Sequence, residues 1–382
     1  MDYKEAAVQL VLNKYEVIKS ERKSNLEKLR KDLTEDKKKL VFFGAGLLGK
    51  SIYALFQNEG IQADTFCDNN EELWGQVITD GKICISPAEL EKMDNIVIFI
   101  TLGKAYEVLQ QLNLMHLKTA EIYQYPLLSF EKMHNNHFDY SKEEISDRLK
   151  IMFDLLEDET SREAAYWQVK GWFADQMQLN SIFFKEIMVG DEYVPKDIFA
   201  EMHEKVIVDC GTYNGDTYRY LKSKGVKWQK YVGFEMDLNN YNEFLTQVTD
   251  EKEQAILKLY HAGVGQEEKT VRYFSGLAGS KISKEGMESS SIVTIDKVIG
   301  DSDEVSYLKM DIEGAEMPAL KGGKKTIKRC RPKCAICAYH QPSDLWEIPV
   351  YLKKLVPEYK IFFRHHDYIH SDIICYATVP AD

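Results

Sequence analysis

Short apolar segments and amphipathic helical segments alternate in two separate stretches of the chain. The first stretch, residues 38–130, contains three apolar segments, and the second, from residue 205 onward, contains seven. Strands that alternate with helices are typical of parallel sheets with helices on both faces. The short link His365–Asp372 favours an antiparallel hairpin at the end of the second sheet. We therefore expect an α/β chain with two doubly wound sheets. The seven predicted strands of the second sheet are 206–209, 230–235, 257–264, 305–311, 334–339, 359–364 and 373–379.

The segments outside these stretches carry helical patterns. Residues 4–36 place apolar side chains on one stripe, which predicts a helix that either packs on its own domain or dimerises as a coiled coil. Whether the chain forms a homo-oligomer stays open. The predicted parts are an N-terminal helix at 1–36, a small Rossmann-like domain of nucleotide-binding type at 37–133, a helical connector at 134–200 and a second Rossmann-like domain at 201–382.

The charge and cysteine content exclude several classes of protein. The chain has 49 Lys and Arg against 61 Asp and Glu, a net charge of −12, whereas a nucleic-acid partner requires a basic face. No apolar run approaches the roughly 20 residues that span a bilayer. The seven cysteines are odd in number and scattered, which indicates reduced thiols. We expect a cytoplasmic protein without a membrane span or a nucleic-acid partner.

A glycine motif, Gly44-x-Gly46-x-x-Gly49, lies between the first predicted strand and a helix. Asp68 ends the next strand, about 20 residues further on. This spacing is the dinucleotide fingerprint, in which glycines let the backbone approach a pyrophosphate at a helix N-terminus. Three interpretations stay open: a second site for a nucleotide or nucleotide sugar, the NAD site of a nucleotide-sugar oxidoreductase or epimerase, and a tight turn that binds nothing.

Three closely spaced cysteines, Cys330, Cys334 and Cys337, have the spacing of a radical iron–sulfur site. Cys334 and Cys337 fall inside a predicted strand, where a separation of three residues directs side chains to opposite faces. A cluster needs a loop that directs all three sulfurs to one point. We therefore predict buried, unligated thiols.

A second glycine motif follows the first strand of the second sheet. Val206–Asp209 ends in a carboxylate, and Gly211 and Gly215 follow it. The next strand ends in Glu235, whose carboxylate can accept both hydroxyls of a ribose. This pairing is typical of class I methyltransferases that use S-adenosylmethionine (SAM).

The second stretch resembles the FkbM family of methyltransferases over roughly residues 190–380. The most specific segment is Lys309–Glu316, in which a strand ends in three closely spaced carboxylates and a glycine. The resemblance implies a seven-stranded class I domain, SAM as methyl donor, and a hydroxyl acceptor on a sugar, polysaccharide or natural product. The first sheet resembles a Rossmann-like module joined to such enzymes. The segments that carry the family resemblance are 208–217, 233–237, 308–323, 331–340 and 359–366.

The resemblance and the strand ends together place the cofactor. Two departures from common methyltransferase patterns are the absence of an acidic residue after the third strand and the presence of only two glycines in the first turn. The expected cofactor-binding residues are Asp209, Gly211, Gly215, Asp216, Thr217, Glu235, Met236, Ala262, Gly263, Ser280 and Asp311.

Methyl transfer to an alcohol requires help with proton loss, because a hydroxyl has a very high pKa. His340, at the end of the fifth strand, is the expected general base, since an unperturbed imidazole has a pKa of about 6.5. Asp311 or Glu313 is expected to orient it or to bind the acceptor, while Glu316 serves a helix N-terminus. Alternatively, these carboxylates bind a divalent cation such as Mg²⁺, although nothing in the sequence specifically indicates a metal.

The sequence therefore predicts a cytoplasmic SAM-dependent O-methyltransferase that acts on a hydroxyl of a sugar, glycan or related small molecule. Two alternatives stay open. One is a nucleotide-sugar oxidoreductase or epimerase that uses the Gly44–Gly49 motif. The other is a module that binds SAM without turning it over.

Overall fold

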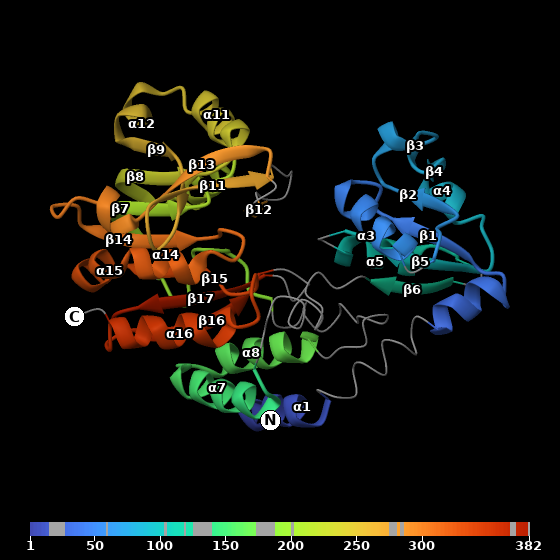
Figure 1. Cartoon of the computed structure of the whole chain (residues 1–382), viewed down its shortest axis with the longest axis horizontal. Helices are drawn as coiled ribbons and strands as arrows, with labels where there is room; N and C mark the ends of the chain where they lie inside the picture. The colour runs from blue at the N-terminus through green and yellow to red at the C-terminus, as the bar shows by residue number, and fades with distance from the viewer. Residues whose placement is uncertain are drawn as a thin grey trace. The chain divides into compact units, whose positions relative to one another are not determined.

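The computed structural model of the chain describes residues 1–14, 27–58, 60–102, 105–117, 120–124, 140–172, 188–199, 202–274, 281–282, 286–366 and 372–380. The chain forms two compact units, one built mainly from Met1–Ser146 and the other mainly from Val189–His366 (Figure 1). Each unit contains its own parallel-rich sheet. Among the described helices, none combines the length and the apolar character needed to cross a membrane.

The first unit has a six-stranded sheet in the order β3-β4-β2-β1-β5-β6. All neighbouring pairs are parallel except β3 and β4. The strand order reverses at β1, so the glycine turn that follows β1 lies at a topological switch point. The strands are β1 (Lys39–Phe43), β2 (Thr65–Cys67), β3 (Val77–Thr79), β4 (Lys82–Ile85), β5 (Ile96–Ile100) and β6 (Ala120–Gln124).

Alternating side chains of β1 fill two cores, one on each face of this sheet. Phe42 packs with Ile52 and Tyr53 of α3 (Leu47–Asn58), whereas Phe43 packs with Val108 of α5 (Ala105–Leu114). Helices on both faces confirm the predicted doubly wound architecture. The sequence did not predict β3, β4 and β6, because β3 and β4 are short and carry exposed apolar side chains that blur the alternation.

The helical segments around this unit agree with the sequence only in part. Near the N-terminus lie α1 (Tyr3–Lys14) and a helical segment at 27–34, while residues 15–26 of the predicted helix lie outside the described part. Leu29 is fully buried in the core of the first unit, as expected for a helix that packs on its own domain. The predicted connector contains α7 (Lys142–Leu155) and α8 (Glu159–Trp172).

The second unit has a seven-stranded sheet in the order β16-β17-β15-β14-β7-β8-β9. β17 is antiparallel to both of its neighbours, which confirms the predicted hairpin, and the other pairs are parallel. The carboxyl ends of β7, β8 and β14 therefore meet at one edge. The strands are β7 (His203–Cys210), β8 (Lys227–Glu235), β9 (Leu257–His261), β14 (Val305–Met310), β15 (Lys333–Cys337), β16 (Lys360–His365) and β17 (Ile373–Thr378).

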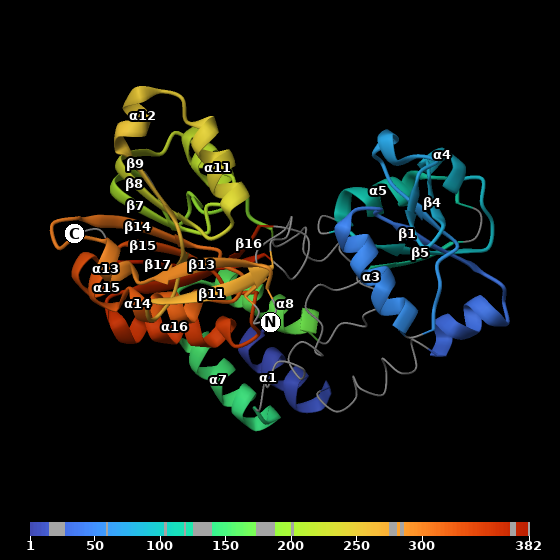
Figure 2. The same cartoon turned by 45° about the horizontal axis from the view of Figure 1, so that its top comes forward.

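Helices cover both faces of this sheet (Figure 2). Cys334 and Cys337 are fully buried in β15, as expected for unligated thiols. The helices of the unit are α10 (Asp216–Ser223), α11 (Leu238–Gln247), α12 (Glu251–Ile256), α13 (Ile295–Val298), α14 (Glu316–Gly322), α15 (Lys324–Cys330) and α16 (Asp344–Leu355).

The predicted strand at 257–264 is wrong in its second half. β9 ends at His261, and β10 (Gly263–Val264) pairs instead with β13 (Glu288–Val293) in a separate sheet. That sheet has the order β10-β13-β11-β12, with β11 at Lys269–Phe274 and β12 at Lys281–Ile282. Residues 257–264 alone cannot show that the chain changes sheets, because the strands that pair with the two halves lie elsewhere in the chain.

Candidate functional site

A cleft of about 890 Å³ opens at the carboxyl ends of β7, β8 and β14 in the second unit. Ligand sites of parallel sheets lie at this edge, and small-molecule pockets commonly have a volume of roughly 300–1,000 Å³. The lining residues are Glu192, Tyr193, Gly211, Tyr213, Asp216, Thr217, Tyr220, Phe234, Glu235, Met236, Asn240, Ala262, Gly263, Val264, Ile292, Lys309, Asp311, Ile312, Glu313, Gly314 and Ala315.

Most of the predicted site residues meet in this cleft. Asp209, Gly215 and His340 lie next to its wall but not among the lining residues, and Ser280 lies outside the described residues. The predicted residues that line the cleft are Gly211, Asp216, Thr217, Glu235, Met236, Ala262, Gly263, Asp311 and Glu313.

The turn after β7 needs glycine at two positions. Gly211 has φ of 86°, and a Cβ there would collide with the carbonyl oxygen of Asp311. Gly215 has φ of 84°, and a Cβ there would collide with the Phe244 ring. Gly211 thus brings the turn against the end of β14, and Gly215 begins α10 close to α11.

Asp209 stabilises this turn from behind. Its carboxylate is fully buried, lies 3.1 Å from Lys309 Nζ and accepts a hydrogen bond from the Tyr231 hydroxyl. Lys309 Nζ also donates to the carbonyl of Gly211 at 2.7 Å. Although burial alone would lower it, the pKa of Lys309 is raised by the Asp209 carboxylate. This placement corrects the expectation that Asp209 contacts the cofactor directly.

Glu235 presents a buried carboxylate at the end of β8. One oxygen accepts the N–H of Tyr213 at 2.9 Å, and the other accepts the N–H of Asp237 at 2.7 Å. Burial raises the pKa of Glu235 to about 7, although the two N–H donors oppose this effect. Each carboxylate oxygen has a further lone pair, so Glu235 can still accept two hydroxyl donors from the cleft.

The side of the cleft beyond Glu235 is apolar and narrow. A Cβ on Gly263 would lie 2.7 Å from Ile292 Cδ1 and 3.3 Å from Met236 Sδ. Ile292 comes from the sheet that the sequence did not predict, so this wall was missed. The slot suits a flat heteroaromatic ring that packs between apolar side chains.

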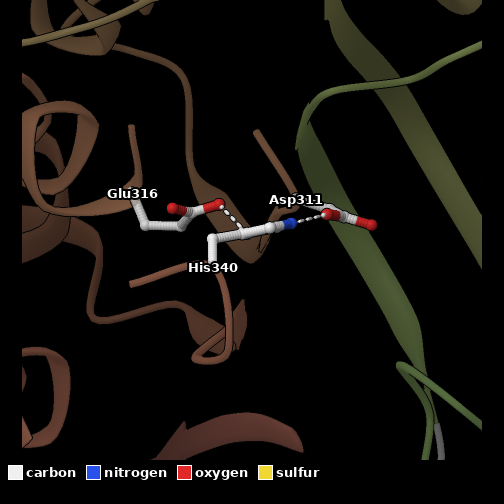
Figure 3. A group of neighbouring side chains, drawn as sticks. All are labelled: Asp311, Glu316 and His340. Atoms are coloured by element: carbon white, nitrogen blue, oxygen red, sulfur yellow. Dashed lines mark hydrogen bonds and ion pairs between the residues drawn. The ribbon is translucent and has the colours of Figure 1, made fainter. Parts of the chain in front are cut away.

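Four ionisable side chains gather where β14 and β15 end. Figure 3 shows three of them, Asp311, Glu316 and His340. His340 Nδ1 lies 2.9 Å from Glu316 Oε1, and Nε2 lies 3.5 Å from Asp311 Oδ1 and 3.8 Å from Glu313 Oε2. Burial would lower the pKa of His340, but the three carboxylates, Glu316 foremost, raise it to about 9. The imidazole of His340 is therefore protonated on both nitrogens at neutral pH, because its pKa lies above the unperturbed value of 6.5.

Asp311 is held in its ionised form in the cleft wall. Burial opposes its ionisation, but the Lys309 and His340 cations and the Tyr193 hydroxyl hold its pKa below the usual value. The turn that follows includes Glu313 with φ of 57° and Gly314 with φ of 95°. This left-handed turn places the Glu313 side chain in the wall beside Asp311.

Glu316 lies at the N-terminus of α14, as the sequence predicted. It also contacts His340, which the sequence did not reveal. Its side chain is fully buried, and Oε1 accepts the N–H of Ile312 at 2.9 Å while facing His340. Asp311, Glu316 and His340 each offer one ligand atom within 4.8 Å of the others, a spacing that a divalent cation could also use.

Three tyrosines in the cleft wall, Tyr193, Tyr213 and Tyr220, were not predicted. Tyr193 lies in the irregular segment 188–199, where no periodic pattern marks the side chains that turn inward. Tyr213 lies in the predicted turn, but its φ of 48° could not be foreseen for a residue with a large side chain.

In the first unit, the Gly44–Gly49 turn is closed by contacts within the protein. A Cβ on Gly49 would collide with the carbonyl oxygen of Gly44, so this glycine packs the helix against the turn. Asp68 uses one oxygen to accept the N–H of Ala45 at 2.8 Å and the other to accept that of Asn70 at 2.9 Å. The acidic residue of the fingerprint, Asp68, thus braces the glycine turn.

Comparisons with known proteins agree with this geometry. Residues 209–369 match the model of the methyltransferase FkbM domain. A crystal structure of methyltransferase FkbM from Methylobacillus flagellatus is 19% identical, with a TM-score of 0.64 over 96% of this chain and 100% of that chain, which shows a shared fold. No curated protein sequence matches the chain significantly.

Two further solved structures match about half of the chain. An rRNA methylase from Streptococcus thermophilus is 12% identical, with a TM-score of 0.32 over 48% of this chain and 90% of that chain. A Streptococcus mutans putative methyltransferase in complex with SAH is 12% identical, with a TM-score of 0.31 over 53% of this chain and 100% of that chain. These scores are too low to carry an argument about this chain.

Proposed function

We propose that the domain at residues 209–369, which matches the model of the methyltransferase FkbM domain, transfers a methyl group from SAM to a hydroxyl of a sugar, a glycan or a related small molecule. The observation that carries the proposal is the presence of Glu235 and Asp311 in one cleft, at the ends of strands on either side of β7. One carboxylate suits a ribose, and the other suits a positively charged group.

The residues of the cleft fit SAM along its length. The apolar slot between Met236, Gly263 and Ile292 suits the adenine, and Glu235 can accept the ribose hydroxyls. Asp216 and Asp311 supply negative charge beyond the ribose position. Bound SAM would supply an already activated methyl group, so the protein's main tasks are to position the acceptor and to receive its proton.

We assign to His340 the role of general base, which accepts the proton of the acceptor hydroxyl. Its Nε2 faces the Asp311–Glu313 part of the cleft wall, while Glu316 holds Nδ1. With a pKa of about 9, the imidazole must first lose its own proton, and a positive charge in the adjacent cleft favours that loss. Neutral His340 then accepts the hydroxyl proton at Nε2, and Glu316 stabilises the imidazolium that results.

Acidic and aromatic side chains in the cleft lining support a hydroxyl-rich acceptor. Glu192 and Glu313 offer oxygens that can accept hydroxyl hydrogen bonds, and Tyr213 and Tyr220 offer aromatic faces. Aromatic rings together with carboxylates suit a sugar, whose ring has both apolar faces and hydroxyl edges.

The proposal is tested in two steps. Calorimetry with the purified full-length chain should first detect binding of SAM. Mass spectrometry should then compare the glycans and sugar metabolites of source cells with and without the gene, and an intact copy should restore the methyl group that disappears, whereas a His340→Ala copy should not. Absence of SAM binding would refute the proposal, while SAM binding without any lost methyl group would favour a module that does not turn SAM over. A fluorescence titration with NAD tests the oxidoreductase alternative.

A further inference from the structure

The segment 188–199, which forms one wall of the cleft, contains two non-glycine residues with left-handed backbone. Asp191 has φ of 61° and Tyr193 has φ of 63°. A large side chain rarely adopts this conformation, and it persists only where the surroundings over-determine it. The structure shows what holds Tyr193 there.

Two tyrosines of the main sheet hold the backbone of Tyr193. Its N–H donates to the hydroxyl oxygen of Tyr376 at 3.0 Å, and its carbonyl accepts from the hydroxyl of Tyr307 at 2.6 Å. Tyr307 belongs to β14 and Tyr376 to β17, and both side chains are fully buried. The rigid sheet therefore fixes the peptide groups on both sides of Tyr193.

His366 extends this clamp to the start of the segment. Its Nε2 lies 2.7 Å from the Tyr376 hydroxyl, and its Nδ1 lies 2.8 Å from the carbonyl oxygen of Val189. Burial lowers the pKa of His366 to about 4, so the ring is neutral at physiological pH. Because a carbonyl can only accept, Nδ1–H donates to Val189, and Nε2 accepts from Tyr376. His366 thus braces the segment.

The clamp directs the Tyr193 side chain onto Asp311. The Tyr193 hydroxyl donates to Asp311 Oδ2 at 3.1 Å, and Lys309 Nζ lies 5.2 Å from the centre of the Tyr193 ring. The other oxygen of Asp311 has longer contacts, 3.4 Å to the Tyr339 hydroxyl and 3.5 Å to His340 Nε2. The bond from Tyr193 is the shortest of these three contacts, and it restrains the rotation of this carboxylate.

We propose that Tyr193 is a positioning residue, held in its left-handed conformation by Tyr307 and Tyr376, that turns the Asp311 carboxylate toward the positively charged sulfur of the cofactor. The inference rests on the proposed function, because it assumes that SAM occupies the cleft. Met236 follows β8 and Asp311 follows β14, and β7 lies between these strands. A ligand with its adenine beside Met236 and its ribose on Glu235 extends past the β7 turn toward Asp311.

The test compares SAM with S-adenosylhomocysteine (SAH), which lacks the methyl group and the positive charge on sulfur. Calorimetry with the full-length chain should show that Tyr193→Phe binds SAM about three- to tenfold more weakly, since one hydrogen bond to a charged group is lost. The affinity for SAH should change less than about twofold. General damage to the fold would instead weaken the binding of both ligands alike.

Two further variants make the comparison specific. Tyr376 contacts the backbone of Tyr193 and does not line the cleft. Tyr376→Phe should therefore weaken the binding of SAM, but not of SAH, as Tyr193→Phe does. Tyr339→Phe also removes a tyrosine hydroxyl that contacts the Asp311 carboxylate. Its contact is longer, 3.4 Å, so this variant should have a smaller effect on the affinity for SAM. Thermal melting of each variant reports whether it folds, and if Tyr376→Phe does not fold, Tyr193→Phe decides alone.

The outcomes separate the inference from the proposed function. If the wild type binds SAM and Tyr193→Phe loses both ligands equally or neither, the positioning role of Tyr193 is wrong while the proposed function stands. If the wild type binds neither SAM nor SAH, the positioning role of Tyr193 and the proposed function are both wrong. A selective loss of SAM in Tyr193→Phe supports the inference.

Discussion

His340 Nδ1 lies 2.9 Å from Oε1 of Glu316, a carboxylate that is fully buried at the first residue of α14. A buried carboxylate is costly unless it is paired, and Glu316 is paired with both the imidazole and the N–H of Ile312. The contact raises the pKa of His340 and leaves Nε2 on the side of the cleft. One carboxylate therefore both begins a helix and orients the proposed base.

The first prediction concerns the pH dependence of turnover. Because the neutral imidazole is the active form and its pKa is about 9, the rate should rise with pH, with the midpoint of the rise near that value. Glu316→Gln removes the largest raising influence, so the midpoint of the rise should move to lower pH. His340→Ala should lower the rate roughly 10²- to 10⁴-fold and keep the affinity for SAM. Initial rates of SAH formation between about pH 6 and 10 measure these effects.

A chelator distinguishes this scheme from metal binding by Asp311, Glu316 and His340. If the imidazole acts as a base between two carboxylates, EDTA should leave the rate and its pH profile unchanged. A rate that EDTA abolishes and Mg²⁺ or Mn²⁺ restores would instead assign these residues to a cation.

The second prediction concerns Glu235 and SAM. Because its pKa is about 7, the carboxylate that accepts the ribose hydroxyls is lost as the pH falls below that value. SAM affinity should therefore rise between pH 6 and 8, and Glu235→Gln should bind SAM about tenfold more weakly at pH 8. Its affinity should also vary less with pH. Calorimetry at several pH values provides the measurement.

The stability of the same variant is an independent control. The folded-state pKa of Glu235 lies above the ordinary 4.5, so its ionisation opposes folding increasingly as the pH rises from 4.5 through 7. Glu235→Gln, whose amide does not ionise, should consequently lose less stability to urea than the wild type does when the pH rises from 4.5 to 8. An equal change with pH in both proteins would contradict the assigned environment.

The third prediction assigns Asp209 to the fold rather than to ligand contact. Asp209→Asn leaves the buried Lys309 ammonium without its counter-charge, and losing one partner of such a pair costs about 3–5 kcal/mol. Urea denaturation should show this loss. The double variant Asp209→Leu/Lys309→Met should lose less stability than the sum of the losses in Asp209→Leu and in Lys309→Met. If Asp209→Asn is as stable as the wild type but does not bind SAM, direct ligand contact would be the better explanation.

The fourth prediction uses two glycines of one motif in the first unit. Gly49→Ala brings a Cβ against the carbonyl oxygen of Gly44 and should destabilise the unit by at least about 1 kcal/mol. Gly46→Ala is the matched control, because no atom lies within 4 Å of its added Cβ. Thermal unfolding measures both. Equal melting temperatures would show that Gly49 is not needed for packing.

Much of the fold follows from local pattern. The strands β7, β8 and β14 each contain a short apolar segment, and Asp209, Glu235 and Asp311 lie at the strand ends or within one residue of them. Such patterns are visible without tertiary information. β10 was merged with β9, and β13 was not predicted. The pairing of a strand depends on distant residues that its own composition does not reveal.

The site shows the same division. Glu235 and Asp311 could be predicted as neighbours, since parallel strands end at one edge of a sheet. The burial of Asp209 behind that edge could not be predicted, because it depends on contacts with Lys309 and Tyr231 from the two adjacent strands. Tyr193 left no signal, since its irregular segment acquires a defined shape only through hydrogen bonds to Tyr307 and Tyr376.

The sequence alone determined that the chain has two doubly wound sheets and that carboxylates end the strands of the second one. Those properties depend on the order of apolar, glycine and acidic residues along the backbone. The tertiary structure alone decided which carboxylate faces the cleft, which supports it from behind, and which raises the pKa of His340. Burial and pairing set these roles, and both arise from residues that are distant in the chain and meet only when the sheet forms.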